Sequence, residues 1–141
     1  MSLDALIGAW NITMRHVAMA QPVTGQQRYE RVLDQAFVML HWTLNHADFP
    51  DALALLDDRT FHYFDVRGVT RIFDFAIGSQ GWAMIRRGDD FWQRCAATFV
   101  DVNTMKGAGE NSHDAGATWQ HDFDITYSRS TEAAAASPTR R

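Results

Sequence analysis

The sequence predicts an all-β fold, an antiparallel up-and-down β-barrel of about nine or ten strands with a short N-terminal helical turn. Between Arg59 and Arg129, short segments with alternating apolar and polar residues follow one another, separated by turn signals such as GSQ, GDD and DVN. Strands this closely spaced, with no helical crossovers, pair antiparallel. A sheet this long in a chain of 141 residues is expected to close into a barrel, because closure removes unpaired edges.

The N-terminal elements come first in this scheme. SLDALIGAW predicts a short helical turn that leads into a strand over residues 9–19. Within that strand one face carries Trp10, Ile12, Met14 and His16. GQQRYERVL and AFVMLHWTLNHA predict the next two strands. In DFPDALALLDDRT the ALALL run is compatible with a helical turn, but Pro50 and the shortness of the run favour a loop followed by a strand of about five residues.

The remaining elements are hairpins. VRG between FHYFD and VTRIF predicts a tight turn in which glycine takes a positive φ. GSQG, RGDD, DVN and SHDAG mark the later turns. The barrel domain is therefore expected to cover residues 1–129, followed by a flexible tail over residues 130–141 that is rich in small residues.

Composition limits the class of protein. A formal charge of −4 argues against nucleic-acid binding, which requires a basic face. A single cysteine, Cys95, permits no internal disulfide and fits a cytoplasmic location, and no secretory signal or membrane-spanning run is visible. We expect neither a membrane partner nor a bound metal. A homodimer formed through exposed aromatic residues stays an open alternative.

The last predicted strand contains the most informative histidine. In it His121, Phe123, Ile125 and Tyr127 alternate with Asp122, Asp124, Thr126 and Ser128. The first set is the more apolar, so we expect His121 inside the barrel or at its rim. His16 is expected on the inner face of the first strand, which neighbours the last strand in a closed barrel. Such a pair suits proton transfer, a metal or haem, and hydrogen-bonded core histidines are the plainer alternative.

Arg71 is the candidate anchor for a ligand. It alternates with Val69, Phe73, Phe75 and Ile77, a pattern that points it inward. A buried guanidinium is costly unless paired, and it can hold a ligand carboxylate through two parallel hydrogen bonds. The alternative is an ion pair with Asp65 at the mouth of the strand.

Two segments leave the inward face undecided. In FHYFD either Phe61, Tyr63 and Asp65 or the intervening residues face inward, and an inward Tyr63 hydroxyl would suit acid–base chemistry. In FWQRCAATFV one face carries Gln93, Cys95 and Ala97, small enough to leave room for a ligand. Cys95 itself is expected to be a buried, unreactive thiol.

The two ends of the chain carry a family resemblance. LIGAW opens the first strand with Leu6, Gly8 and Trp10, and TWQHDFDITYSR closes the chain with Trp119, Tyr127 and Arg129. Together they resemble the lipocalin-like (calycin) barrels, and HYFDVRGVTRIF is similar to the central hairpin of bacterial lipocalin-like domains. The resemblance implies a ligand pocket inside a barrel.

The sequence also resembles, more distantly, the nitrobindins, which hold haem through a histidine on the C-terminal strand. Their glycine-rich opening strand is absent here. His121 lies six residues before Tyr127, whereas the nitrobindin histidines align at odd offsets, on the other strand face. Haem is therefore the last of the alternatives considered.

These observations favour binding of a small hydrophobic or amphipathic molecule in the barrel. The residues expected to contact it are Arg71, Trp10, Met14, Phe73, Phe75, Cys95, Phe123 and Tyr127. The first alternative is a small isomerase, cyclase or hydratase that uses His121, His16 or Tyr63 as general acid or base. The second is haem binding, and no other cofactor is expected.

Overall fold

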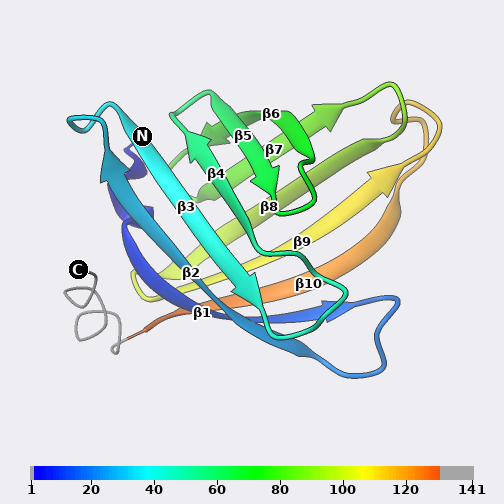
Figure 1. The fold of residues 1–141 in the computed structure, drawn as a ribbon, viewed down its shortest axis with the longest axis horizontal. Helices are drawn as coiled ribbons and strands as arrows, with labels where there is room; N and C mark the ends of the chain where they lie inside the picture. The colour runs from blue at the N-terminus through cyan, green and yellow to red at the C-terminus, as the bar shows by residue number, and fades with distance from the viewer. Residues whose placement is uncertain (1, 131–141) are drawn as a thin grey trace.

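The computed structural model describes residues 2–130 and confirms the predicted fold class (Figure 1). A single-turn 3-10 helix, η1 (Leu3–Leu6), precedes ten strands. They are β1 (Gly8–His16), β2 (Val23–Val32), β3 (Phe37–Leu44), β4 (Ala52–Leu56), β5 (Thr60–Asp65), β6 (Thr70–Ile77), β7 (Gly81–Arg87), β8 (Trp92–Asp101), β9 (Thr104–Ser112) and β10 (Gln120–Arg129). Except for Ser130, the tail predicted over 130–141 lies outside the described residues.

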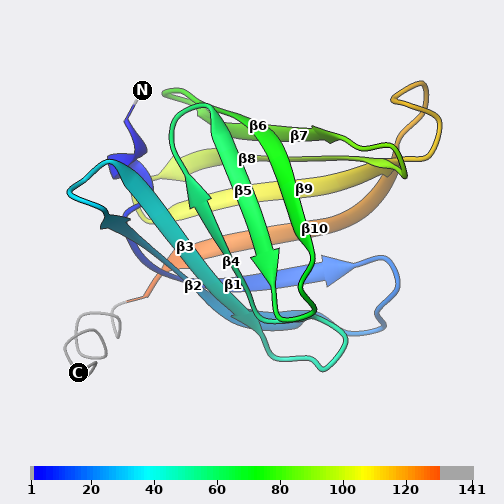
Figure 2. The same ribbon diagram turned by 45° about the horizontal axis from the view of Figure 1, so that its top comes forward.

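The strands form one closed antiparallel barrel. Each strand pairs with its neighbours in the chain, and β1 closes the sheet against β10. Figure 2 shows β4, β5 and β6 crossing over β7–β10 at a steep angle, so the barrel has two curved layers. The odd-numbered strands run away from η1, and the strand ends at the opposite side of the barrel form a mouth.

The end of the barrel beside η1 is closed by packing. Leu6 is only 1% exposed, and Trp10 directly above it is equally buried. The indole Nε1 of Trp10 donates to the carbonyl oxygen of Leu6 at 2.9 Å. The guanidinium of Arg129 lies 4.2 Å from the centre of the Trp10 ring and donates to the carbonyl oxygens of Ala5 and Ile7. The opening motif and the closing arginine therefore hold the base together.

The inward faces follow the predicted period-two pattern in most strands. Phe61 and Tyr63 face inward together with Asp65, which settles the face of β5 that the sequence left undecided. β4 is a strand of five residues, as expected from ALALL. Gly68 takes a φ of 82° in the β5–β6 turn, as the VRG signal predicted.

Strand β1 ends earlier than predicted. The sequence indicated a strand to residue 19, but β1 stops at His16. There the amide of Met19 donates to the His16 carbonyl oxygen at 3.0 Å, and the amide of Ala18 donates to His16 Nδ1 at 3.0 Å. These bonds turn the chain away from the sheet, because they occupy backbone groups that would otherwise pair with a neighbouring strand.

A glycine explains how one interior aromatic ring is accommodated. Gly109 on β9 pairs with Phe123 on β10, and a Cβ atom at this position would overlap the Phe123 ring. A glycine inside a strand often marks such a close approach, because it has no side chain to displace.

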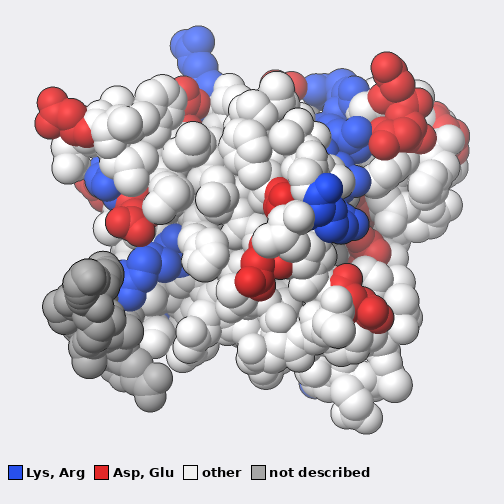
Figure 3. Space-filling view, in the orientation of Figure 1, with Lys and Arg blue, Asp and Glu red and all other residues white. Residues whose placement is uncertain are grey.

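The outer surface carries mixed charge. On the face drawn in Figure 3, acidic and basic side chains are interspersed, and neither sign forms a continuous patch. Within residues 2–130, no helix combines the length and apolar character needed to cross a membrane.

Candidate ligand-binding site

The barrel interior contains a cavity of about 290 Å³ that reaches the mouth opposite η1. This is at the lower end of the size range of small-molecule pockets. Of the residues predicted to contact a ligand, six line it. They are Met14, Arg71, Phe73, Cys95, Phe123 and Tyr127. Because the base is packed and the mouth carries the charged groups, the cavity has a mainly apolar interior with a few uncharged polar groups, and a charged entrance.

Two of the residues predicted to contact the ligand, Trp10 and Phe75, lie outside the cavity lining. Both are buried on the inner face, but neither lines the cavity. Trp10 lies at the base, and Phe75 stacks on Trp82 with ring centres 6.1 Å apart. The period-two pattern predicted the correct face for both residues, but it carries no information on depth along the barrel axis.

The prediction that His121 faces inward is wrong. In the β9–β10 ladder His121 pairs with Glu110 and Phe123 pairs with Gly109, so Asp122 is an extra residue, a β-bulge. The bulge reverses the alternation, and the His121 side chain, 46% exposed, bonds Asp124 on the outer face at 2.9 Å. Asp122 takes the inward position at the mouth instead.

His16 faces inward, as predicted, and the structure places it at the mouth, where both of its ring nitrogens are engaged. Nε2 lies 3.0 Å from the Asp122 carboxylate, and Nδ1 accepts from the amide of Ala18. The neutral ring therefore carries its proton on Nε2 and donates it to Asp122. In this arrangement His16 ties the end of β1 to the bulge of β10 and has no free nitrogen to exchange a proton with a ligand.

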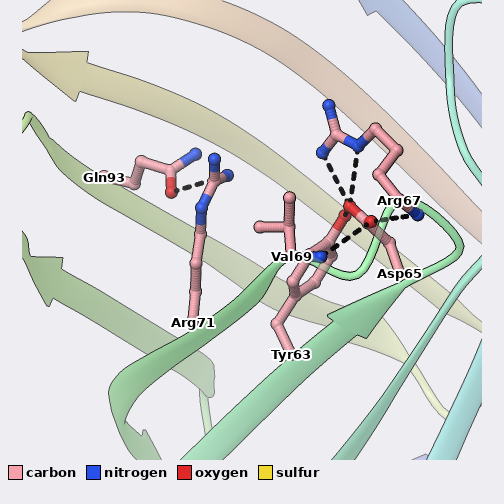
Figure 4. Close-up of polar contacts among 6 residues, drawn as sticks. All are labelled: Tyr63, Asp65, Arg67, Val69, Arg71 and Gln93. Atoms are coloured by element: carbon pink, nitrogen blue, oxygen red, sulfur yellow. Dashed lines mark hydrogen bonds and ion pairs between the residues drawn. The ribbon is translucent and has the colours of Figure 1, made fainter.

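A second polar group at the mouth is built around Asp65 (Figure 4). The Tyr63 hydroxyl donates to Asp65 Oδ2 at 2.6 Å, and the Arg67 guanidinium donates to the same oxygen at 2.6 and 3.1 Å. The bonds to Arg67 hold the pKa of Asp65 well below its usual range. Burial, together with the bond to Asp65, raises the pKa of Tyr63 to about 12, so its phenol stays protonated at neutral pH.

Replacing Asp65 by asparagine is expected to loosen the β5–β6 turn. The backbone amide of Arg67 donates to Asp65 Oδ1 at 2.8 Å, and a neutral amide is a weaker acceptor than a carboxylate. The protection factor of the Arg67 amide, its intrinsic hydrogen-exchange rate divided by the observed rate, should fall by roughly tenfold. Acid should have the same effect on the unmodified protein. Because the native pKa of Asp65 is lowered, its carboxylate stabilises the turn above pH ~4, and this stabilisation is lost as the pH falls through the native pKa.

The amide of Phe75 is the internal control for that measurement, because it donates to the Arg59 carbonyl oxygen and makes no contact with Asp65. Its exchange rate should be unchanged. Equal acceleration at Phe75 and Arg67 would mean that the substitution loosens the whole barrel, which contradicts a local role.

Arg71 points into the cavity from the start of β6, as predicted. Its guanidinium makes a 3.4 Å hydrogen bond to Gln93 Oε1 (Figure 4). The same group lies 6.0 Å and 5.4 Å from the ring centres of Tyr63 and Phe91. The alternative of an ion pair with Asp65 is not what the structure shows, because Asp65 pairs with Arg67. Within the described residues, no carboxylate lies within 4 Å of the Arg71 side-chain nitrogens.

Cys95 faces the cavity from β8. Burial raises the pKa of its thiol to about 12, so the thiolate is scarce at neutral pH. Thiolate character determines cysteine reactivity. The side chain therefore acts as a small wall residue, in agreement with its expected unreactive character.

Several cavity residues were missed by the sequence reasoning. Gln27 and Tyr29 face inward from β2, and Trp82 faces inward from β7. A signal for the first two existed, because Val23, Gly25, Gln27 and Tyr29 keep one period-two phase with apolar or small neighbours. No comparable local signal marked Asp122, since the alternation continues unbroken through the letters of β10.

Histidine ligation of haem does not fit the residues present. The nitrogens of His16 are occupied by Asp122 and Ala18, and His121 lies on the outer face. A haem iron requires an axial side chain with a free donor atom directed at it. Neither histidine that the sequence singled out meets this requirement.

Comparison with known proteins shows a likeness to solved structures. No family model and no curated protein sequence matches the chain. Among solved structures, an S-type phycobiliprotein lyase from Guillardia theta aligns with a TM-score of 0.57 at 11% identity, over 93% of this chain and 94% of that one. The likeness is one of fold. It supports the lipocalin-like barrel that the two terminal motifs suggested, and at this identity it carries no site residue across.

Proposed function

We propose that this barrel binds a small amphipathic molecule with an anionic head group, the head at Arg71 and the apolar body in the cavity. The main support for the proposal is the environment of the Arg71 guanidinium. It is a half-buried cation that lines the cavity and is held between aromatic rings, and it lacks a carboxylate partner among residues 2–130.

The chemistry of the guanidinium selects the head group. An arginine removed from water is stabilised by an anion, and its planar fork matches a carboxylate, sulfonate or phosphate through two parallel hydrogen bonds. Gln93, bonded to Arg71 at 3.4 Å, orients the fork and leaves donors unused. The head group therefore lies at the mouth, where contact with water lowers the cost of placing its charge.

The apolar walls select the body of the ligand. Below Arg71 the cavity is lined by side chains such as Phe73, Leu40 and Ile125. Burying an aliphatic or flat aromatic chain against them is favourable by about 25 cal/mol per Å² of apolar area. The volume of about 290 Å³ restricts the ligand to a small molecule.

Binding of decanoic acid to Arg71→Gln, measured by calorimetry, tests the proposal. We expect the variant to bind decanoate roughly 10- to 100-fold more weakly than the unmodified protein, because a charge-assisted hydrogen-bond pair is lost. Decanol, which lacks the anion, should bind both proteins with similar affinity.

Arg87→Gln is the matched control. Arg87 is on β7 near the same end, but its side chain is 53% exposed and pairs with Asp74 on the outer face. This variant should bind decanoate as the unmodified protein does. Equal losses in the two variants would indicate a general charge effect and would overturn the assignment of Arg71, and absence of decanoate binding to the unmodified protein would overturn the proposed ligand class.

The enzymatic alternative receives less support from the same geometry. It needs His16 or Tyr63 to exchange a proton with a bound molecule. His16 is bonded through both nitrogens, and the Tyr63 hydroxyl donates to Asp65 with its pKa raised to about 12. Ligand binding needs no rearrangement of these contacts and is therefore the function that the site supports best.

A further inference from the structure

Two polar atoms deep in the barrel have no hydrogen-bond partner among the described residues. They are the amide oxygen of Gln27 and the indole Nε1 of Trp82. Both side chains line the cavity and are more than nine-tenths buried, with 9% and 8% of their surface exposed. A buried polar group without a partner costs stability, and native proteins contain few of them.

The lining of the same cavity contains two further polar groups. The hydroxyls of Tyr29 and Tyr127 belong to side chains lining the same cavity, and neither makes a hydrogen bond within the described residues. Tyr127 packs against Trp82 with ring centres 6.4 Å apart. An interior built only for an aliphatic chain would have phenylalanine or leucine at such positions, because these avoid the cost of desolvating a polar group.

Gln27 and Trp82 require complementary partners. The Gln27 oxygen needs a hydrogen-bond donor, and the Trp82 indole needs an acceptor. A hydroxyl group supplies both, whereas a carbonyl serves only Trp82 and a methyl group serves neither.

We propose a second polar subsite at Gln27 and Trp82, deep in the barrel, which binds a hydroxyl group on the part of the ligand remote from its anionic head. This inference rests on the proposed function, in which Arg71 holds the head. It adds a statement about the ligand itself, which is then a hydroxylated amphipathic anion and not a plain fatty acid.

The two subsites lie at different depths of one cavity. Arg71 is at the mouth end of β6, and Ile77 at the other end of that strand pairs with Trp82. The backbones of Arg71 and Trp82 are therefore roughly 20 Å apart along the strand direction. The separation along the barrel axis is smaller because barrel strands tilt, and both side chains extend into the cavity between them.

The test compares decanoic acid with 10-hydroxydecanoic acid, which share the head and the chain and differ in a terminal hydroxyl. We expect the unmodified protein to bind the hydroxy acid at least about fivefold more tightly, the gain from completing buried hydrogen bonds. Gln27→Met removes the amide oxygen with little change of shape, and Trp82→Phe removes the indole N–H but also shortens an aromatic side chain. Each should reduce this ratio of affinities toward one, and because the ratio compares the two acids in the same variant, a change in the cavity wall that affects both acids equally cancels.

Ile72→Thr is the control, because Ile72 is 59% exposed on the outer face. This substitution should leave the ratio of the two affinities unchanged. A ratio of one or less in the unmodified protein, with decanoate binding still dependent on Arg71, overturns the subsite and leaves the head-group proposal intact. Failure of both acids to bind overturns both proposals. The comparison in the unmodified protein needs no variant, so it decides the matter even where a substitution impairs folding.

Discussion

Replacing Trp10 by alanine is expected to lower the free energy of unfolding by about 3–5 kcal/mol, the usual cost of removing a fully buried aromatic side chain. Trp10 is 1% exposed and fills the base of the barrel between η1 and the first and last strands. The substitution leaves a cavity there, and the carbonyl oxygen of Leu6 and the guanidinium of Arg129 lose a partner. Denaturant unfolding followed by circular dichroism measures the effect.

Trp119→Ala is the matched control for Trp10→Ala. Trp119 also lies under an arginine, with the Arg94 guanidinium 3.9 Å from its ring centre, but it is only half-buried. If burial dominates, this substitution costs about 1 kcal/mol, the value of a cation–π contact at an accessible site. Similar losses for the two variants would show that the arginine contacts, and not the filling of the base, determine stability.

Alkaline pH is expected to unfold the barrel cooperatively at roughly pH 12. Burial raises the pKa of Tyr29 and Tyr127 far above the usual value of about 10. Because the native pKa values are raised, the stabilisation is fully present below pH 10 and falls as the pH rises toward them. Each of these two tyrosines removes about 1.4 kcal/mol per pH unit, and ionisation of the buried Cys95 thiol, whose pKa is also raised, adds a loss of similar size from pH ~9 upward. Together the three groups remove about 4 kcal/mol per pH unit, against a typical stability of 5–15 kcal/mol.

Tyrosinate absorbance against pH, recorded with far-ultraviolet circular dichroism, checks this prediction. The signals of Tyr29 and Tyr127 should appear together with the loss of strand signal. Tyr127→Phe should lower the slope of stability against pH by about a third, because two of the three buried groups with raised pKa values stay in place. It should cost little stability at neutral pH, because the Tyr127 hydroxyl has no hydrogen-bond partner among the described residues. Titration of all three tyrosines near pH 10 in a folded protein would contradict the burial of Tyr29 and Tyr127.

The barrel fold was predictable because its signals are local. Alternation of apolar and polar residues reports which face of a strand is buried, and turn residues such as Gly68 report where strands reverse. The order of closely spaced strands then leaves antiparallel pairing of neighbours as the simplest topology. Arg71 and His16 were placed on the inner face by the same local rule, and the structure agrees on both.

The details of the site depended on contacts between distant parts of the chain. The bulge at Asp122 reverses the alternation of β10, and it follows from pairing with β9, which no pattern within β10 reports. For the same reason His121 lies outside and Asp122 meets His16 at the mouth.

By itself, the sequence determined the strand order, the inward face of most strands and the inward cation at Arg71, since each depends on residues next to one another in the chain. Only the tertiary structure decided the depth of each side chain, the partner of Asp65 and the presence of both Gln27 and Trp82 in the lining of one cavity. Depth and partnership depend on the tilt and register of ten strands closing into one barrel, and no single segment contains that information.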